Sequence, residues 1–318
     1  MVRRLMKTVS ALLLVALVMA GVFFYSIFIT VERLTVNYQT IASPKIPADL
    51  NDVQIAFIAD LEYNHFMDKE RFTKMIKTIN EVHPDIVIFG GDIFDMPLTY
   101  VPNDATKQEV AQLLKTIDAP LGKFAVLGEQ DNADENVYNM VLDILRTSDF
   151  ELLENTAIRL RNQTQASVTL IGLDALVNGT IDLESAFSNV TADQFNILVA
   201  HCPDTILMEN LPKDHIDLML AAHSHASQIN LPLLGSMSSD EGAEKYNHGK
   251  YTVGNTVLHV SNGLGTSTMD MRLFSPPQML VYRLVHQETA KPASDKTEKS
   301  TQSDQNNNND AAEAAPQT

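Results

Sequence analysis

The fold of this chain follows from the stretch Gln54-Ile-Ala-Phe-Ile-Ala-Asp60-Leu-Glu62, a short apolar run that ends in carboxylates. Such a run is typical of a strand buried on both faces of a sheet. Two further runs repeat the pattern, Asp85-Ile-Val-Ile-Phe-Gly-Gly91 and Lys123-Phe-Ala-Val-Leu-Gly128. Helically spaced apolar residues follow each run, which predicts helices over 68–82, 106–117 and 136–147. This order predicts an α/β domain whose first strands are largely parallel.

The second half of the chain is richer in predicted strands than the first. Apolar runs there predict strands at 157–160, 168–172, 195–200, 218–222, 256–261 and 279–284. Two sheets packed face to face, with helices outside, accommodate them.

Carboxylate and imidazole side chains follow the predicted strands. Ligands of such sheets bind beyond the carboxyl ends of the strands, so these side chains are the candidate site. Each is ordinary by itself, since a Gly-Asp pair often forms a turn and a histidine is often a core residue. Seven of them in succession suit two Mn²⁺, Fe or Zn²⁺ ions, with no thiolate needed. The seven residues are Asp60, Glu62, Asp92, Glu129, His201, His223 and His225.

The order of these motifs resembles the signature of the calcineurin-like metallophosphoesterase family. The matching motifs are Asp60-Leu-Glu62, Gly91-Asp92-Ile-Phe-Asp95, Gly128-Glu129-Gln130-Asp131, His201 and Ala222-His223-Ser224-His225. The likeness covers roughly residues 54–285. Residues 228–232 and 260–267, with Arg272, resemble a bacterial membrane-associated branch related to UDP-2,3-diacylglucosamine hydrolases. The resemblance implies a four-layer α/β/β/α sandwich.

The resemblance also implies a role for each ligand. One metal ion would be held by Asp60, Asp92 and His225, and a second by Asp92, His201 and His223, so that Asp92 bridges the pair. Two divalent ions can activate a water molecule and clamp the phosphoryl oxygens during in-line attack. We expect Mn²⁺, with Fe or Zn²⁺ as the alternatives.

Three positions depart from the family pattern. Glu62 stands where the family has a histidine ligand, and Glu129 where it has an asparagine; both carboxylates can still bind metal and favour Mn²⁺. Gln130 stands where the family has a histidine that serves the leaving group. Glutamine donates a hydrogen bond but transfers no proton. His65 is a candidate replacement acid, although an exposed loop histidine is the competing interpretation.

The N-terminal segment predicts a membrane anchor. An apolar run from Ala11 to Thr30 is long enough to cross a bilayer. Arg3, Arg4 and Lys7 precede it, which places the N-terminus in the cytoplasm and the remaining chain outside. A cleaved signal peptide is the alternative. The expected organisation is an anchor and linker over 1–37, a catalytic domain over 38–287 and a disordered polar tail over 288–318.

Charge narrows the range of partners. The net charge of −17 argues against a nucleic-acid surface. We therefore expect a membrane-anchored phosphoesterase that hydrolyses a phosphate ester or pyrophosphate bond at the outer face of the cell membrane. Its expected partner is a phosphorylated small molecule or lipid head group. The alternative is a metal-binding, catalytically impaired homologue that recognises phosphorylated ligands.

Overall fold

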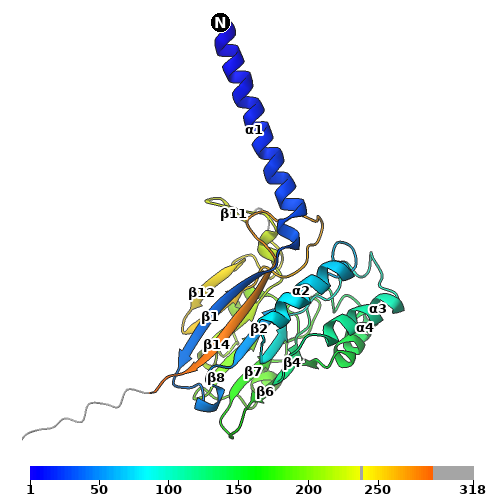
Figure 1. Ribbon diagram of the computed structural model, residues 1–318. Helices are drawn as coiled ribbons and strands as arrows, with labels where there is room; N and C mark the ends of the chain where they lie inside the picture. Colours follow the sequence, from blue (N-terminus) through cyan, green and yellow to red (C-terminus); the bar gives the residue numbers. More distant parts are fainter. Residues whose placement is uncertain (237–238, 289–318) are drawn as a thin grey trace, which may run out of the picture. The chain divides into compact units, whose positions relative to one another are not determined.

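Two six-stranded sheets pack face to face in this computed structural model, which describes residues 1–236 and 239–288 (Figure 1). The first sheet has the order β1-β14-β2-β3-β4-β5, with bounds Thr35–Ser43, Gln278–His286, Gln54–Ile58, Ile86–Phe89, Gly122–Ala125 and Glu151–Leu152. The second has the order β12-β13-β9-β8-β7-β6, with bounds Gly249–Val253, Thr256–Val260, Leu218–Ala221, Phe195–Val199, Val168–Gly172 and Thr156–Leu160. A small hairpin joins β10 (Asn230–Leu231) to β11 (Gly235–Ser236).

Helices cover the outer faces of both sheets. Figure 1 shows three of them together beside the first sheet: α2 (Lys69–Glu81), α3 (Asp104–Lys115) and α4 (Glu135–Thr147). Their starts are capped by Asp68, Asn103 and Asp134, whose side chains each accept a backbone N–H hydrogen bond. The layer on the second sheet is thinner and contains α5 (Leu183–Phe187) and short 3₁₀ turns.

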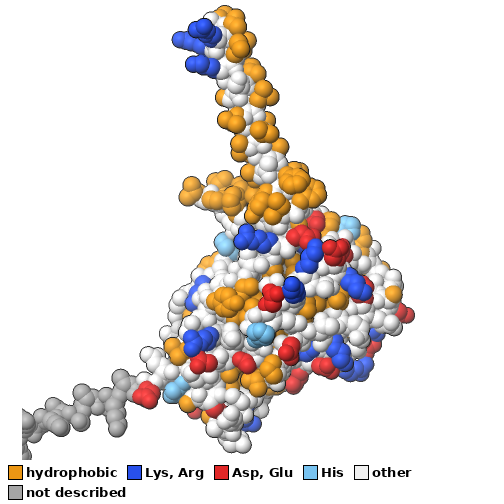
Figure 2. All heavy atoms as spheres, viewed as in Figure 1, with side chains coloured by type: hydrophobic (Ala, Val, Ile, Leu, Met, Phe, Trp, Pro, Cys, Tyr) orange, Lys and Arg blue, Asp and Glu red, His pale blue; other side chains and the backbone are white. Residues whose placement is uncertain are grey.

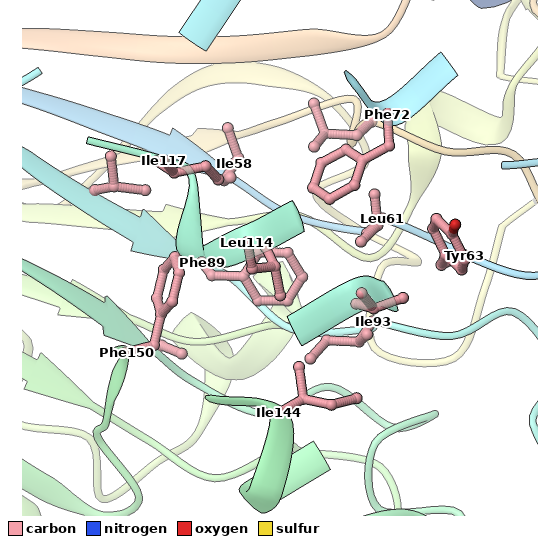
Figure 3. Close-up of a cluster of buried hydrophobic side chains, with 14 of the residues drawn as sticks. Ile58, Leu61, Tyr63, Phe72, Phe89, Ile93, Leu114, Ile117, Ile144 and Phe150 are labelled. Atoms are coloured by element: carbon pink, nitrogen blue, oxygen red, sulfur yellow. The ribbon is translucent and has the colours of Figure 1, made fainter. Parts of the chain in front are cut away.

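Strand β2 shows why the sequence folds into layers. Ile55 and Phe57 point into the core between the two sheets, whereas Ala56 and Ile58 point into the core beneath the helices. Both faces are buried because successive strand side chains alternate in direction. Figure 3 shows the helix-side cluster, where side chains of the strands meet those of α2, α3 and α4. The four-layer α/β/β/α fold is confirmed.

The predicted strands and helices of the central chain are all present, with ends shifted by a few residues. The sequence did not reveal β1, which pairs in parallel with β14 and begins at Thr35, inside the segment assigned to the linker. Its side chains are half-buried or exposed, so it lacks the apolar run that marks the inner strands. Strand β12 and the β10–β11 hairpin were missed for the same reason. The predicted polar tail lies outside the described residues, except for Glu288.

The N-terminal helix α1 (Val2–Phe28) buries only Ser26 among its 27 residues. Among the described residues, the segment Val2–Glu32 is long and apolar enough to cross a membrane. Its most apolar window has a mean hydropathy of 2.7, and 6% of that window is buried. The exposed apolar surface of α1 is visible in Figure 2. These features match the predicted membrane anchor.

Candidate metal centre

Most of the predicted ligands sit in backbone turns that a non-glycine residue rarely adopts. Asp60, Glu62, Asp92, His223 and His225 have φ angles of 50°, 50°, 60°, 69° and 49°. Each such left-handed residue costs on the order of 1–3 kcal/mol, and such residues cluster at functional sites because the surrounding structure enforces them. The strain turns these side chains inward at the ends of β2, β3 and β9.

Asp131 joins the turn that carries Asp92 to the loop that begins at Gly128. Its carboxylate accepts hydrogen bonds from the backbone N–H groups of Asp92 (2.8 Å), Ile93 (3.0 Å) and Gly128 (3.0 Å). The two segments pack so closely that a Cβ atom on Gly91 would lie 2.5 Å from the backbone nitrogen of Gly128. Asp131 thus positions the loop that carries Asp92, which explains an aspartate at this place in the motif.

Four of the seven predicted ligands form one tight group. The ligand atoms of Asp92, Glu129, His201 and His223 all lie within 4.8 Å of one another. His201 Nε2 lies 3.2 Å from Asp92 Oδ2 and 2.9 Å from Glu129 Oε2. His223 Nδ1 lies 3.0 Å from the same Glu129 oxygen. No other group of three or more such ligands occurs at this spacing among residues 1–236 and 239–288.

In His201 and His223, one ring nitrogen contacts a backbone carbonyl and the other faces the tight group. His201 Nδ1 lies 2.7 Å from the carbonyl oxygen of Gly90, and His223 Nε2 lies 2.8 Å from that of Glu241. Only a protonated ring nitrogen can bond to a carbonyl, so the opposite nitrogens can offer lone pairs to a metal. Those two nitrogens and Glu129 Oε2 are buried and make no hydrogen bond, although they lie close together. These residues therefore fit a divalent cation.

The other three predicted ligands lie beside this group. Glu62 Oε1 is 3.3 Å from His225 Nε2. Asp60 Oδ1 accepts the backbone N–H of His223 at 3.1 Å and lies 3.8 Å from His201 Nδ1. Asp60 Oδ2 and Glu62 Oε2 are buried without a partner. The structure thus gathers all seven residues in one region but draws only four of them into a tight set.

The electrostatics of the site show a surplus of negative charge. Burial raises the pKa of Glu62, and the neighbouring carboxylate of Asp60 raises it further. Burial and Glu129 likewise raise the pKa of Asp92. Burial would raise the pKa of Glu129, but His201 and His223 together outweigh burial and lower that pKa. A divalent cation would supply the positive charge and displace the protons that these groups otherwise hold.

The two predicted catalytic residues occupy different places. Gln130 lines a pocket of about 640 Å³ together with Glu62, Glu129 and His223, and its backbone N–H donates to Asp92 Oδ1 at 2.9 Å. His65 does not line this pocket; it is exposed and stacks on another ring, that of Tyr100, at 4.2 Å. The structure therefore brings Gln130 to the site and leaves His65 outside it.

The sequence motifs assign no role to several residues that support the ligands. The fully buried Arg272 donates through Nε to the carbonyl of Gly265 at 3.1 Å, and its Nη2 lies 3.4 Å from His225 Nδ1. The Ser267 hydroxyl donates to Asp95 at 2.7 Å. The sequence also could not predict that the carbonyls of Gly90 and Glu241 contact the imidazoles, because every residue has a backbone carbonyl. For Arg272 and Ser267 the available signal was the resemblance of residues 260–267 and Arg272 to the membrane-associated branch, which gave neither residue a role at the site.

Comparison with known proteins shows the family of this chain. The model of the calcineurin-like phosphoesterase family matches residues 53–227, which include all seven ligand-type residues. The chain belongs to this family. It is 29% identical to the uncharacterized metallophosphoesterase YkuE of Bacillus subtilis over 85% of this chain and 92% of the relative. The family is one of metal-dependent hydrolases, so the chain is a phosphoesterase-type enzyme.

Two further relatives of this chain have names that state an enzymatic activity. The UDP-2,3-diacylglucosamine pyrophosphatase LpxG of Chlamydia trachomatis is 25% identical over 77% of this chain and 87% of the relative. The phosphodiesterase YaeI of Escherichia coli is 26% identical over 73% of this chain and 82% of the relative. Both names describe cleavage of a phosphate bond, which agrees with the class of enzyme.

Proposed function

We propose that this protein hydrolyses a phosphate ester or pyrophosphate bond at the outer face of a membrane, using two divalent cations. The observation that carries the proposal is the buried group of Asp92, Glu129, His201 and His223. Its ligand atoms lie within 4.8 Å of one another, those of Glu129, His201 and His223 have no hydrogen-bond partner, and Glu129 and His223 line a pocket. Buried polar atoms without partners are rare in folded proteins, and a metal site accounts for them.

The tight group supports the ligand set of one ion, and the set of the other rests on the family resemblance and on the contact between Glu62 and His225. Asp92, Glu129, His201 and His223 would hold one ion, and Asp60, Glu62, His225 and Asp92 the other. Carboxylates predominate, which favours Mn²⁺ over softer ions. Ions at such a site supply Lewis-acid activation of water and of the phosphoryl group.

The protein side chains supply position and charge. The carboxylates of Glu62 and Glu129 line the pocket. Their negative charge repels a phosphate group wherever the bound cations do not offset that charge. Gln130 lies on the same wall and can donate an amide hydrogen bond to the leaving oxygen, but it cannot protonate that oxygen. The site is therefore suited to leaving groups that depart without a proton, such as activated esters and the phosphates of a pyrophosphate.

The proposed location rests on the N-terminal segment. Arg3, Arg4 and Lys7 precede the apolar part of α1, and such clusters stay on the cytoplasmic side. The domain that follows α1 would then lie outside the cytoplasm. A phosphorylated lipid head group or envelope precursor is the substrate class within reach of a site anchored in this way. The pyrophosphatase activity in the name of the chlamydial relative supports the same class.

Turnover by the full chain in detergent tests the proposal. With added Mn²⁺, we expect hydrolysis of bis(4-nitrophenyl) phosphate or 4-nitrophenyl phosphate that a chelator abolishes and Mn²⁺ restores. The variant His223→Ala should lose most of this activity because it removes a ligand of the tight group. The matched variant His215→Ala should keep it, since His215 lies in a 3₁₀ turn away from the pocket. Metal binding without turnover of either ester would favour a phosphate-recognising homologue instead.

A further inference from the structure

Exposed apolar side chains gather around the C-terminal end of α1. Figure 2 shows hydrophobic side chains at the base of this helix, where Figure 1 places the β10–β11 hairpin. Leu233 and Leu234, at the hairpin tip, are 106% and 78% exposed, and Phe274 is 61% exposed. We call the following residues the apolar collar: Phe28, Leu233, Leu234, Met269 and Phe274. Exposed clusters of this kind mark binding surfaces for proteins or membranes.

Backbone hydrogen bonds join the segments of the collar into one surface. The N–H of Arg272 donates to the carbonyl of Ser26 in α1 at 3.0 Å. Leu273 forms a parallel bridge with Ile229, and its carbonyl accepts the N–H of Asn230 at 2.9 Å. The hairpin, the 269–274 loop and the end of α1 are therefore tied to one another. The occupant of the collar must also contact α1.

The length of α1 favours a bilayer as this occupant. Its 27 residues rise about 40 Å, which exceeds the roughly 30 Å thickness of a hydrocarbon core. Val22 and Tyr25, in its last turns, line a groove of about 570 Å³ together with Phe274. When α1 crosses the membrane, this groove lies at the edge of the hydrocarbon. Arg33 lines the same groove and would then place a cation at head-group level.

The metal-site pocket borders the same segments. Gln228 and Ile229, which precede the hairpin, and Met269 of the collar line the pocket that also contains Glu129 and His223. The pocket mouth is thus adjacent to the collar. We infer that the collar inserts into the membrane leaflet around α1 and presents the pocket to phosphate groups of amphiphiles embedded in that leaflet. This inference rests on the proposed anchor and hydrolytic site.

Site-specific fluorescence on the full chain in phosphatidylcholine–phosphatidylglycerol nanodiscs tests the insertion. Leu234→Cys and, as control, Gln163→Cys would each carry an environment-sensitive dye; the native Cys202 is buried, and unmutated protein reports any background. Gln163 lies in the loop that enters β7, at the opposite end of the strands from the ligands. We expect a blue shift and at least twofold quenching by nitroxide-labelled acyl chains at position 234 only. Equal quenching by aqueous iodide at both positions, with none by the lipid nitroxide, would overturn the insertion.

A pair of substrates tests the consequence for access to the site. The double variant Leu233→Asp/Leu234→Asp should hydrolyse 4-nitrophenyl hexadecyl phosphate in vesicles at least tenfold more slowly than the wild type. Its rate on soluble bis(4-nitrophenyl) phosphate should not change, because neither leucine lines the pocket. Tyr38→Asp, which alters an exposed aromatic on β1, should leave both rates unchanged. Equal effects of the double variant on both substrates would refute preferential access from the bilayer. No turnover by any protein would refute the proposed function, while the fluorescence still decides the insertion.

Discussion

Replacing Asp92 with alanine is expected to remove most of the bound metal and to lower turnover by about 10³-fold or more. Asp92 Oδ2 belongs to the tight ligand group, and the residue is the proposed bridge to the second ion. Metal ions stabilise the transition state of phosphoryl transfer by several kcal/mol, and each 1.36 kcal/mol corresponds to a tenfold change in rate. The metal content by mass spectrometry and the rate on an activated ester measure both effects.

Asp85→Ala is the matched control. Asp85 precedes the same strand, β3, at the opposite end from Asp92, and accepts the backbone N–H of Gln54 at 2.8 Å. Its replacement should lower stability without altering the number of bound ions. An Asp92→Ala protein that retains full metal occupancy would show that Asp92 is no ligand, whatever its activity.

Replacing Gln130 with histidine is expected to speed the hydrolysis of alkyl phosphate esters far more than that of nitrophenyl esters. Gln130 lines the pocket and cannot transfer a proton, so a poor leaving group departs unassisted. General acid catalysis is typically worth about 10²–10⁴-fold, which sets the scale of the expected gain for alkyl esters. A nitrophenolate hardly needs a proton and should gain little. The ratio of kcat/KM for the two ester types is the measurement.

Two variants control for this effect. Gln130→Asn keeps an amide without a proton to give and should leave the ratio near that of the wild type. His65→Ala should leave it unchanged as well, because His65 stacks on Tyr100 outside the pocket. A Gln130→His protein with the wild-type ratio would mean that the ring does not reach the leaving oxygen. A changed ratio in His65→Ala would bring that histidine back as the acid.

The inner strands and the ligand-bearing turns could be predicted from the sequence because their patterns are strong and local. Strand β2 is continuously apolar and leads directly to Asp60, and the same holds for β3 and Asp92. Edge strand β1 could not be predicted in this way, since its residues are only half-buried. Its pairing with β14 joins segments more than 240 residues apart, which no local pattern records.

The sequence predicted which residues form the candidate metal site, but not the distances between their side-chain atoms. The sequence placed His201, His223 and Glu129 among the ligands without indicating that Glu129 would lie within about 3 Å of both imidazoles. It also could not show that His65 turns outward. The positions of these side chains are set by left-handed backbone turns and by backbone carbonyls that bond to the imidazoles. Both features result from the packing of the whole domain. The apolar collar could not be predicted from the sequence either, because its residues come from three separate segments of the chain.

The number of metal ions bound per chain tests the central claim most directly. The full chain, purified in detergent and supplied with Mn²⁺, should hold two ions after removal of excess metal, as counted by inductively coupled plasma mass spectrometry. Anomalous scattering from crystals of the same protein should place one ion among Asp92, Glu129, His201 and His223, and the other beside Asp60, Glu62 and His225. A single ion confined to the first group, or no retained metal, would contradict the dinuclear site.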